Sequence, residues 1–179
     1  MNDKSLQEQY LRRILNSKVY DVAIESPLEE AAALSRKLGN HFLLKREDLQ
    51  GVHSFKIRGA YNKMSQLPRA ALQKGVLAAS AGNHAQGVAF AASRYGAKAT
   101  IVMPTTTPLI KVERTQHYGG MAVLHGDVYD EACEYAMQLA EENGYTFIHP
   151  FNDYRIMAGQ GKSADGLALG VHLVVHGGG

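Results

Sequence analysis

The sequence predicts an α/β fold, a parallel sheet with helices on both faces. Four short apolar runs between residues 75 and 148 have the length and composition of buried strands. Segments with helical periodicity separate these runs, and glycine or proline marks most of their ends. Short strands that alternate with helices form βαβ units, whose right-handed crossovers place helices on both faces of one parallel sheet.

Three helices and a strand are expected before this region. Apolar side chains within residues 10–15 fall at helical spacing, which indicates a short amphipathic helix. Residues 26–29, Ser-Pro-Leu-Glu, predict the start of a second helix that the serine caps, the proline opens and the glutamate completes as a capping box. This helix should end at Gly39. The apolar run 42–44 is strand-like, and a further helix should start after Ser54, whose hydroxyl can cap it.

The pattern is more regular in the sheet region. Each predicted helix there is closed near a glycine, and Asp127 is expected to cap the last of them. The expected helices are residues 85–95, 107–119 and 127–144. The expected strands are residues 75–79, 99–103, 121–124 and 145–148. Because these local signals agree with one another, residues 76–151 should form the stable core and the tail 161–179 should be the least protected region.

Composition places the chain among ordinary globular proteins. Its 179 residues suit one domain or slightly more, with 45% hydrophobic and 20% charged residues. A formal net charge of +2 and the lack of a basic run argue against a nucleic-acid partner. No apolar run approaches the ~20 residues of a membrane helix, and the polar start does not resemble a secretory signal. Because the sequence has a single cysteine, Cys133, no intramolecular disulfide can form, and a cytoplasmic location is expected. Cys133 itself fits a packing role.

Three places carry residues that could do chemistry. Lys56 falls in the first turn of a predicted helix, where the helix dipole lowers a lysine pKa and favours a nucleophilic amine; a solvated surface lysine is the alternative. The loop 80–83 joins the end of a strand to the start of a helix, where a carboxylate ligand can bind; the alternative is a capped turn that binds no ligand. The terminal glycines 177–179 can close around a phosphate or form a flexible end. His172 and His176 have a metal-like spacing but no neighbouring carboxylate or cysteine, so no metal site is expected.

Three motifs resemble one enzyme family. Residues 54–59, Ser-Phe-Lys-Ile-Arg-Gly, resemble the lysine motif of the fold-type II pyridoxal-phosphate enzymes. Residues 45–50, Lys-Arg-Glu-Asp-Leu-Gln, and residues 80–89, which begin Ser-Ala-Gly-Asn-His, are similar to the biosynthetic threonine dehydratases of that family. The similarity runs nearly unbroken from about residue 19 to residue 161.

The resemblance implies a cofactor, pyridoxal 5'-phosphate, and the residues that bind it. In the family, the lysine that matches Lys56 binds the cofactor covalently, and the phenylalanine that matches Phe55 packs beside the cofactor ring. Asn83 is expected to hydrogen-bond the phenolic oxygen of the cofactor. A glycine loop that holds the cofactor phosphate corresponds to Gly177, Gly178 and Gly179. The loop expected to bind the substrate carboxylate consists of Ser80, Ala81, Gly82, Asn83 and His84.

The implied reaction converts L-threonine, a small amino-acid substrate, to 2-oxobutanoate and ammonia, the first step of isoleucine biosynthesis, with L-serine as a second substrate. Lys56, as a free amine, would abstract the Cα proton, and the β-hydroxyl would then leave. In related serine racemases the position of Ala81 holds a serine that acts as acid and base on the opposite face of the substrate. Alanine cannot exchange a proton, which favours dehydration over racemisation; a serine dehydratase or a racemase-like enzyme is the alternative.

The resemblance weakens beyond residue 161. The family continues there with an amphipathic helix, whereas residues 162–170 contain two glycines and form a helix poorly. The expected division is residues 1–50 as an N-terminal segment of the large cofactor domain, 51–152 as a small domain that carries the lysine and asparagine loop, and 153–179 as a truncated start of the large domain that ends in the glycine loop.

Because most of the large domain is expected to be missing, two interpretations stay open. The chain is either an active lyase, for which a homo-oligomer is possible, or a folded fragment without catalytic competence. In both interpretations Lys56 should lie near the loop 80–83, because both belong to the small domain.

Overall fold

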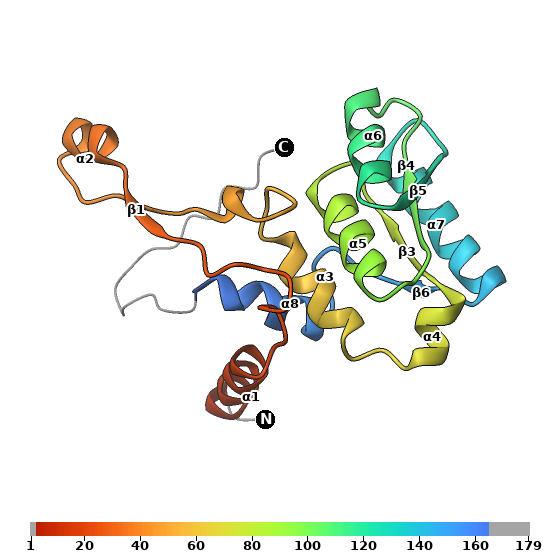
Figure 1. The fold of residues 1–179 in the computed structure, drawn as a ribbon, viewed down its shortest axis with the longest axis horizontal. Helices are drawn as coiled ribbons and strands as arrows, with labels where there is room; N and C mark the ends of the chain where they lie inside the picture. The colour runs from red at the N-terminus through yellow and green to blue at the C-terminus, as the bar shows by residue number, and fades with distance from the viewer. Residues whose placement is uncertain (1–2, 165–179) are drawn as a thin grey trace.

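The computed structural model describes residues 3–164, and within them the chain is built around a four-stranded parallel sheet (Figure 1). The strands lie in the order β5-β4-β3-β6, and each neighbouring pair is parallel. Their bounds are β3 (Val76–Ala79), β4 (Ala99–Met103), β5 (Gly120–Leu124) and β6 (Thr146–Phe147). The predicted α/β sheet is confirmed, and each strand lies within one residue of its expected bounds.

Helices cover both faces of this sheet, as predicted. The helices that follow the strands are α5 (Asn83–Arg94), α6 (Leu109–His117) and α7 (Tyr129–Asn143). Side chains alternate along each strand, so Val76 and Ala78 of β3 pack into one apolar cluster with α5. Leu77 and Ala79 point to the other face, where they pack with Ala132 of α7. Burial on both faces explains why β3 and β4 are continuous apolar runs.

Helix α3 (Lys56–Met64) packs beside α5, and α8 (Tyr154–Gly161) packs in turn against α3. Glycines permit the close approach: a Cβ atom on Gly159 would lie 2.5 Å from the Arg58 carbonyl oxygen, and one on Gly87 would lie 3.0 Å from the Lys56 carbonyl carbon. The start of α3 is thereby held against α5. Neither α8 nor the short helix α4 (Arg69–Lys74) was predicted.

The N-terminal part lies beside the sheet region and includes an arm that projects from it (Figure 1). Helix α1 (Asp3–Leu15) confirms the first predicted helix. The arm consists of an antiparallel pair of strands and helix α2, and the 3-10 helix η1 follows it. The bounds are β1 (Leu28–Glu30), α2 (Ala32–Leu38), β2 (Leu43–Lys45) and η1 (Glu47–Leu49); a second 3-10 helix, η2 (Lys162–Ala164), ends the described chain.

Three predicted helix caps are wrong, and for Ser26 and Asp127 the reason is a tertiary hydrogen bond that takes the capping side chain. The Ser26 hydroxyl donates to the Glu47 carboxylate at 2.5 Å, and the residues after it pair as a strand. Helix α2 therefore begins later, although Gly39 ends it in the left-handed conformation as expected. The Ser54 hydroxyl is buried and caps nothing, and the Asp127 carboxylate accepts a hydrogen bond from Thr105 at 2.9 Å.

The predictions for the C-terminal end lie outside the described residues. They concern most of the tail 161–179, with His172, His176 and the glycines 177–179. Among the helices of residues 3–164, none has the length and apolar character that a membrane crossing requires.

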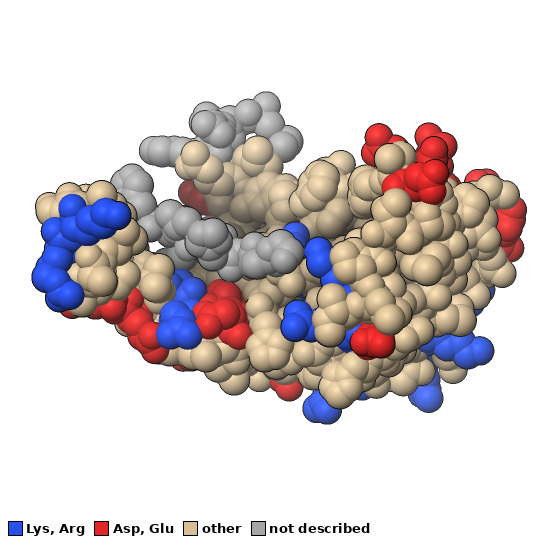
Figure 2. All heavy atoms as spheres, turned by 90° about the horizontal axis from the view of Figure 1, so that it is seen from above, with Lys and Arg blue, Asp and Glu red and all other residues tan. Residues whose placement is uncertain are grey.

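On the face shown in Figure 2, basic residues gather over α2, and elsewhere blue and red side chains are interspersed with neutral surface.

Candidate active site

The candidate site lies where two neighbouring strands end. Strands β3 and β6 are parallel partners, so the segments that follow them, residues 80–82 and 148–150, leave the sheet at the same edge. Ligands of open parallel sheets bind at this edge. Lys56, the first residue of α3, reaches it from outside the sheet: its Nζ donates to the Pro150 carbonyl oxygen at 3.1 Å.

Lys56 has the surroundings of a reactive amine. Its side chain is half-buried, and partial burial lowers the pKa of its ammonium group. The ring of Phe55 lies 5.2 Å from Nζ, and among described residues Pro150 is the only hydrogen-bond acceptor of that nitrogen. A lowered pKa raises the fraction of neutral, nucleophilic amine near neutral pH. The expectation that Lys56 occupies the first turn of a helix is confirmed.

A buried polar network fixes the start of α3. The Arg58 guanidinium donates from Nε and Nη2 to the two oxygens of Glu47, each at 2.8 Å, and Nη2 also donates to the Ile24 carbonyl. Gln50 binds both backbone groups of Ile24, at 2.9 and 2.8 Å. All three side chains are about 1% exposed or less. This network explains why the motif 45–50 accompanies the lysine motif: the first holds the second in place.

The loop after β3 is organised by Ser80. Its hydroxyl oxygen accepts hydrogen bonds from the backbone N–H groups of Gly82 at 3.2 Å and Ala85 at 3.3 Å. Helix α5 begins at Asn83, so its positive end faces the segment 80–82. A Cβ atom on Gly82 would meet no atom within 4 Å, which leaves open space beside the loop. Ala81 is partly buried against the core and carries no titratable group.

His84 connects this loop to the segment after β6. Its Nε2 bonds the Ile148 carbonyl oxygen at 2.9 Å, which requires the proton on Nε2. Burial lowers the pKa of His84 to about 4, and the positive charge of Lys56 and then that of His149 contribute. The imidazole is therefore neutral at pH 7, and its Nδ1 is a buried acceptor without a hydrogen-bond partner among the described residues.

The structure thus brings together Lys56, Phe55 and the loop 80–84, as expected. Sequence reasoning missed the segment 148–150, which supplies carbonyl acceptors to both Lys56 and His84. The His149 ring packs between the rings of Phe147 and Phe151, and its Nδ1 accepts the backbone N–H of Asn152 at 2.7 Å. The sequence could have indicated this segment, because a predicted strand ends at residue 148 and the carboxyl ends of parallel strands meet at one edge of the sheet, where ligands bind.

The neutral state of His84 predicts acid sensitivity. Its folded-state pKa of about 4 lies below the usual value of 6.5, so the unfolded chain binds the proton more tightly. The stabilisation is complete above pH 6.5 and is lost as the pH falls toward 4. We expect urea unfolding to show a loss of roughly 2 to 3 kcal/mol between pH 7.5 and pH 4.5. His84→Gln should remove this part of the pH dependence, and His41→Gln, at an exposed histidine, should keep it. Equal pH profiles for His84→Gln and the wild type would contradict the assignment.

Comparisons with known proteins agree on one family. The model of the pyridoxal-phosphate dependent enzyme family matches residues 19–177. Threonine dehydratase from Nicotiana attenuata is 58% identical over 153 residues, and the chain spans 86% of its own length but 26% of that relative. The processed form of threonine deaminase isoform 2 from Solanum lycopersicum has a TM-score of 0.86 at 55% identity, over 91% of this chain and 45% of that one. Maize serine racemase has a TM-score of 0.81 at 31% identity, over 87% of this chain and 47% of that one.

Proposed function

Since the chain belongs to the pyridoxal-phosphate dependent enzyme family, we propose that it acts as a threonine ammonia-lyase with Lys56 as its central residue. The observation that carries this proposal is the half-buried Lys56 amine, with its lowered pKa, at the edge where β3 and β6 end. Threonine dehydratase and threonine deaminase are the names of relatives that share 58% and 55% of the aligned residues. The proposed substrate is therefore L-threonine, with L-serine second.

The residues of the site fit pyridoxal 5'-phosphate. Lys56 offers an amine for the aldehyde carbon, and Phe55 offers a ring beside that amine. Two buried polar atoms, Ser54 Oγ and His84 Nδ1, have no hydrogen-bond partner among the described residues, although buried polar atoms normally have one. We propose that Asn83 also binds the cofactor. The glycines 177–179, proposed for its phosphate, lie outside the described residues.

Each residue then has a proposed task. The bound cofactor would supply an electron sink for the negative charge that develops at Cα of the substrate. Lys56 Nζ would take the Cα proton, which a lowered pKa permits near neutral pH. The loop 80–84, oriented by the Ser80 hydroxyl and placed at the positive end of α5, would bind the substrate carboxylate. The open space beside Gly82 leaves room for the substrate.

Ala81 supports elimination rather than racemisation. Racemisation needs a second group that exchanges a proton on the face of the substrate opposite Lys56. Ala81 occupies the loop at the position proposed for that group, and its side chain packs against the apolar core. The Ser80 hydroxyl already accepts two backbone N–H groups. We therefore propose dehydration and deamination as the main reaction.

Product analysis with the wild-type chain tests this function. The chain is incubated with pyridoxal 5'-phosphate and L-threonine, and 2-oxobutanoate is quantified. We expect release of 2-oxobutanoate from threonine and of pyruvate from serine, each dependent on added cofactor. D-serine formed from L-serine is measured in parallel, and we expect less of it than pyruvate. Absence of both keto acids would show that this chain has no lyase function.

A further inference from the structure

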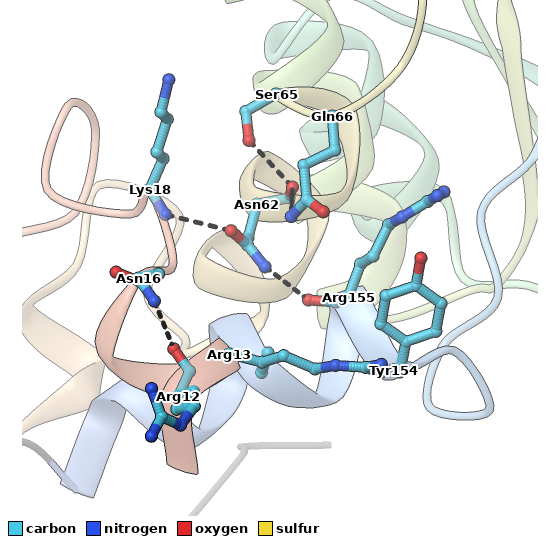
Figure 3. Close-up of a pocket in the computed structure, with 10 residues that line it drawn as sticks. Arg12, Arg13, Asn16, Lys18, Asn62, Ser65, Gln66, Tyr154 and Arg155 are labelled. Carbon is cyan, nitrogen blue, oxygen red and sulfur yellow. Dashed lines mark hydrogen bonds between the residues drawn. The ribbon is translucent and has the colours of Figure 1, made fainter. Parts of the chain in front are cut away.

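A cavity of about 290 Å³ lies at the end of α3 that is remote from Lys56. Its walls come from α1 and the residues after it, from the last turns of α3, and from the start of α8 (Figure 3). Asn62, which lines it, follows Lys56 by six residues, or about 9 Å along a helix axis. The cavity is therefore separate from the candidate active site, although one helix serves both.

The lining is strongly cationic. Four basic side chains, Arg12, Arg13, Lys18 and Arg155, line the cavity together with amide and hydroxyl groups, and no carboxylate of residues 3–164 lines it. None of the four forms an ion pair within residues 3–164. Like charges that share one cavity repel one another unless an anion lies between them. No carboxylate within the described residues neutralises this positive charge through an ion pair.

Two of the guanidinium groups are held by one aromatic ring. The Arg13 guanidinium lies 4.2 Å from the centre of the Tyr154 ring, and that of Arg155 lies 5.0 Å from it. In Figure 3 both side chains lie near Tyr154, while Arg12 and Lys18 extend outward on the other side. The Nε of Arg155 is buried and has no hydrogen-bond partner within the described residues. A guanidinium placed by stacking keeps its fork of N–H donors for an oxyanion.

Asn62 ties the walls of the cavity together. Its side-chain oxygen accepts the Lys18 backbone N–H at 3.0 Å, and its amide donates to the Arg155 carbonyl at 2.7 Å (Figure 3). Ser65 and Gln66 both donate to the Asn62 carbonyl oxygen. Asp153 precedes Tyr154 and Arg155 in the chain but does not line the cavity. Its carboxylate accepts a hydrogen bond from Lys63 Nζ at 2.5 Å. The walls are thus set before any ligand arrives, which reduces the ordering cost of binding.

We infer that this cavity binds a small oxyanion of the phosphate class, with Arg13 and Arg155 as its main ligands. A phosphate group offers several oxygen atoms to paired guanidinium groups, and the volume admits a phosphate with a small organic substituent. The cavity is distinct from the edge where β3 and β6 end and where Lys56 lies, and the inference does not depend on the lyase assignment. Because α1, α3 and α8 all contribute, the anion would join the N-terminal helix to the helix that begins with Lys56.

Calorimetric titration with inorganic pyrophosphate tests this site. The chain is first saturated with pyridoxal 5'-phosphate, so that the cofactor position is filled, and ionic strength is held constant with potassium chloride. We expect saturable binding, with chemical-shift changes in an NMR spectrum concentrated at Arg13, Asn62 and Arg155. If pyrophosphate shows no saturable binding, the inference is overturned.

Matched variants separate a built site from general charge attraction. Arg13→Gln should weaken pyrophosphate binding about 10-fold, since an exposed side chain is changed and the fold is spared. Arg155→Gln should weaken it at least as much. Arg36→Gln, which removes an equal charge from the exposed surface of α2, should change it less than twofold. Equal weakening by Arg13→Gln and Arg36→Gln, or an unchanged affinity in Arg13→Gln, would overturn the inference.

Discussion

Replacing Lys56 with alanine is expected to abolish both cofactor attachment and turnover. Lys56 combines a half-buried amine, a pKa lowered by burial and a position at the edge where β3 and β6 end. A side chain that binds a cofactor covalently and also moves a proton leaves no substitute when it is removed, so activity should fall about 10³-fold or more.

The measurement combines trapping and kinetics. Borohydride reduction of the chain with pyridoxal 5'-phosphate, followed by peptide mass analysis, should place the label on Lys56 in the wild type. In Lys56→Ala the visible absorption of the bound cofactor and the label on that peptide should be lost. Lys98→Ala, which changes an exposed lysine beyond α5, serves as the control and should retain both. Equal labelling of Lys98 and Lys56 in the wild type would refute the assignment of Lys56.

Glu47→Gln should strongly destabilise the fold. Glu47 and Arg58 form a buried pair with two hydrogen bonds of 2.8 Å, and both side chains are 1% exposed or less. The Ser26 hydroxyl also donates to Glu47. Neutralising the carboxylate leaves the Arg58 charge buried without its counter-charge. The new amide NH₂ group would also face the N–H and O–H donors of Arg58 and Ser26, to which it cannot form hydrogen bonds as an acceptor. Removal of one partner of such a pair costs roughly 3 to 5 kcal/mol in unfolding free energy.

Urea unfolding monitored by circular dichroism measures this cost. Asp48→Asn is the matched control, because Asp48 follows Glu47 in the chain but pairs with Arg46 at the exposed surface. Exposed ion pairs contribute little, so the midpoint of this variant should stay close to that of the wild type. Similar midpoints for Glu47→Gln and the wild type would show that the buried pair does not stabilise the fold.

Much of the fold could be predicted because its signals are local. The four strands are short apolar runs, of which β3 and β4 are buried on both faces, and their bounds follow from composition alone. Gly39, Gly96 and Gly144 have positive φ at or just beyond helix ends, where only a residue without Cβ fits easily. Lys56 at the first turn of α3 also followed from its neighbours in sequence.

The errors arose where a side chain has two possible partners. Ser26 and Asp127 both suit a helix cap, but their polar groups bond Glu47 and Thr105, respectively. A local cap and a tertiary hydrogen bond satisfy the same oxygen equally well, so the sequence cannot choose between them. The residues after Ser26 consequently became a strand, since backbone pairing with β2 satisfied their N–H and C=O groups.

The sequence by itself determined the parallel sheet, the helix that begins with Lys56 and the membership of one enzyme family. Only the tertiary structure decided which groups surround the lysine and how α3 is fixed. Pro150 lies 94 residues from Lys56, and Arg155 lies 93 residues from Asn62, yet each pair is joined by a hydrogen bond. The periodicity of a sequence reports which face of each element is apolar, but not which elements meet. That choice depends on close packing of complete surfaces, such as the approach of Gly159 to Arg58 that places α8 against α3.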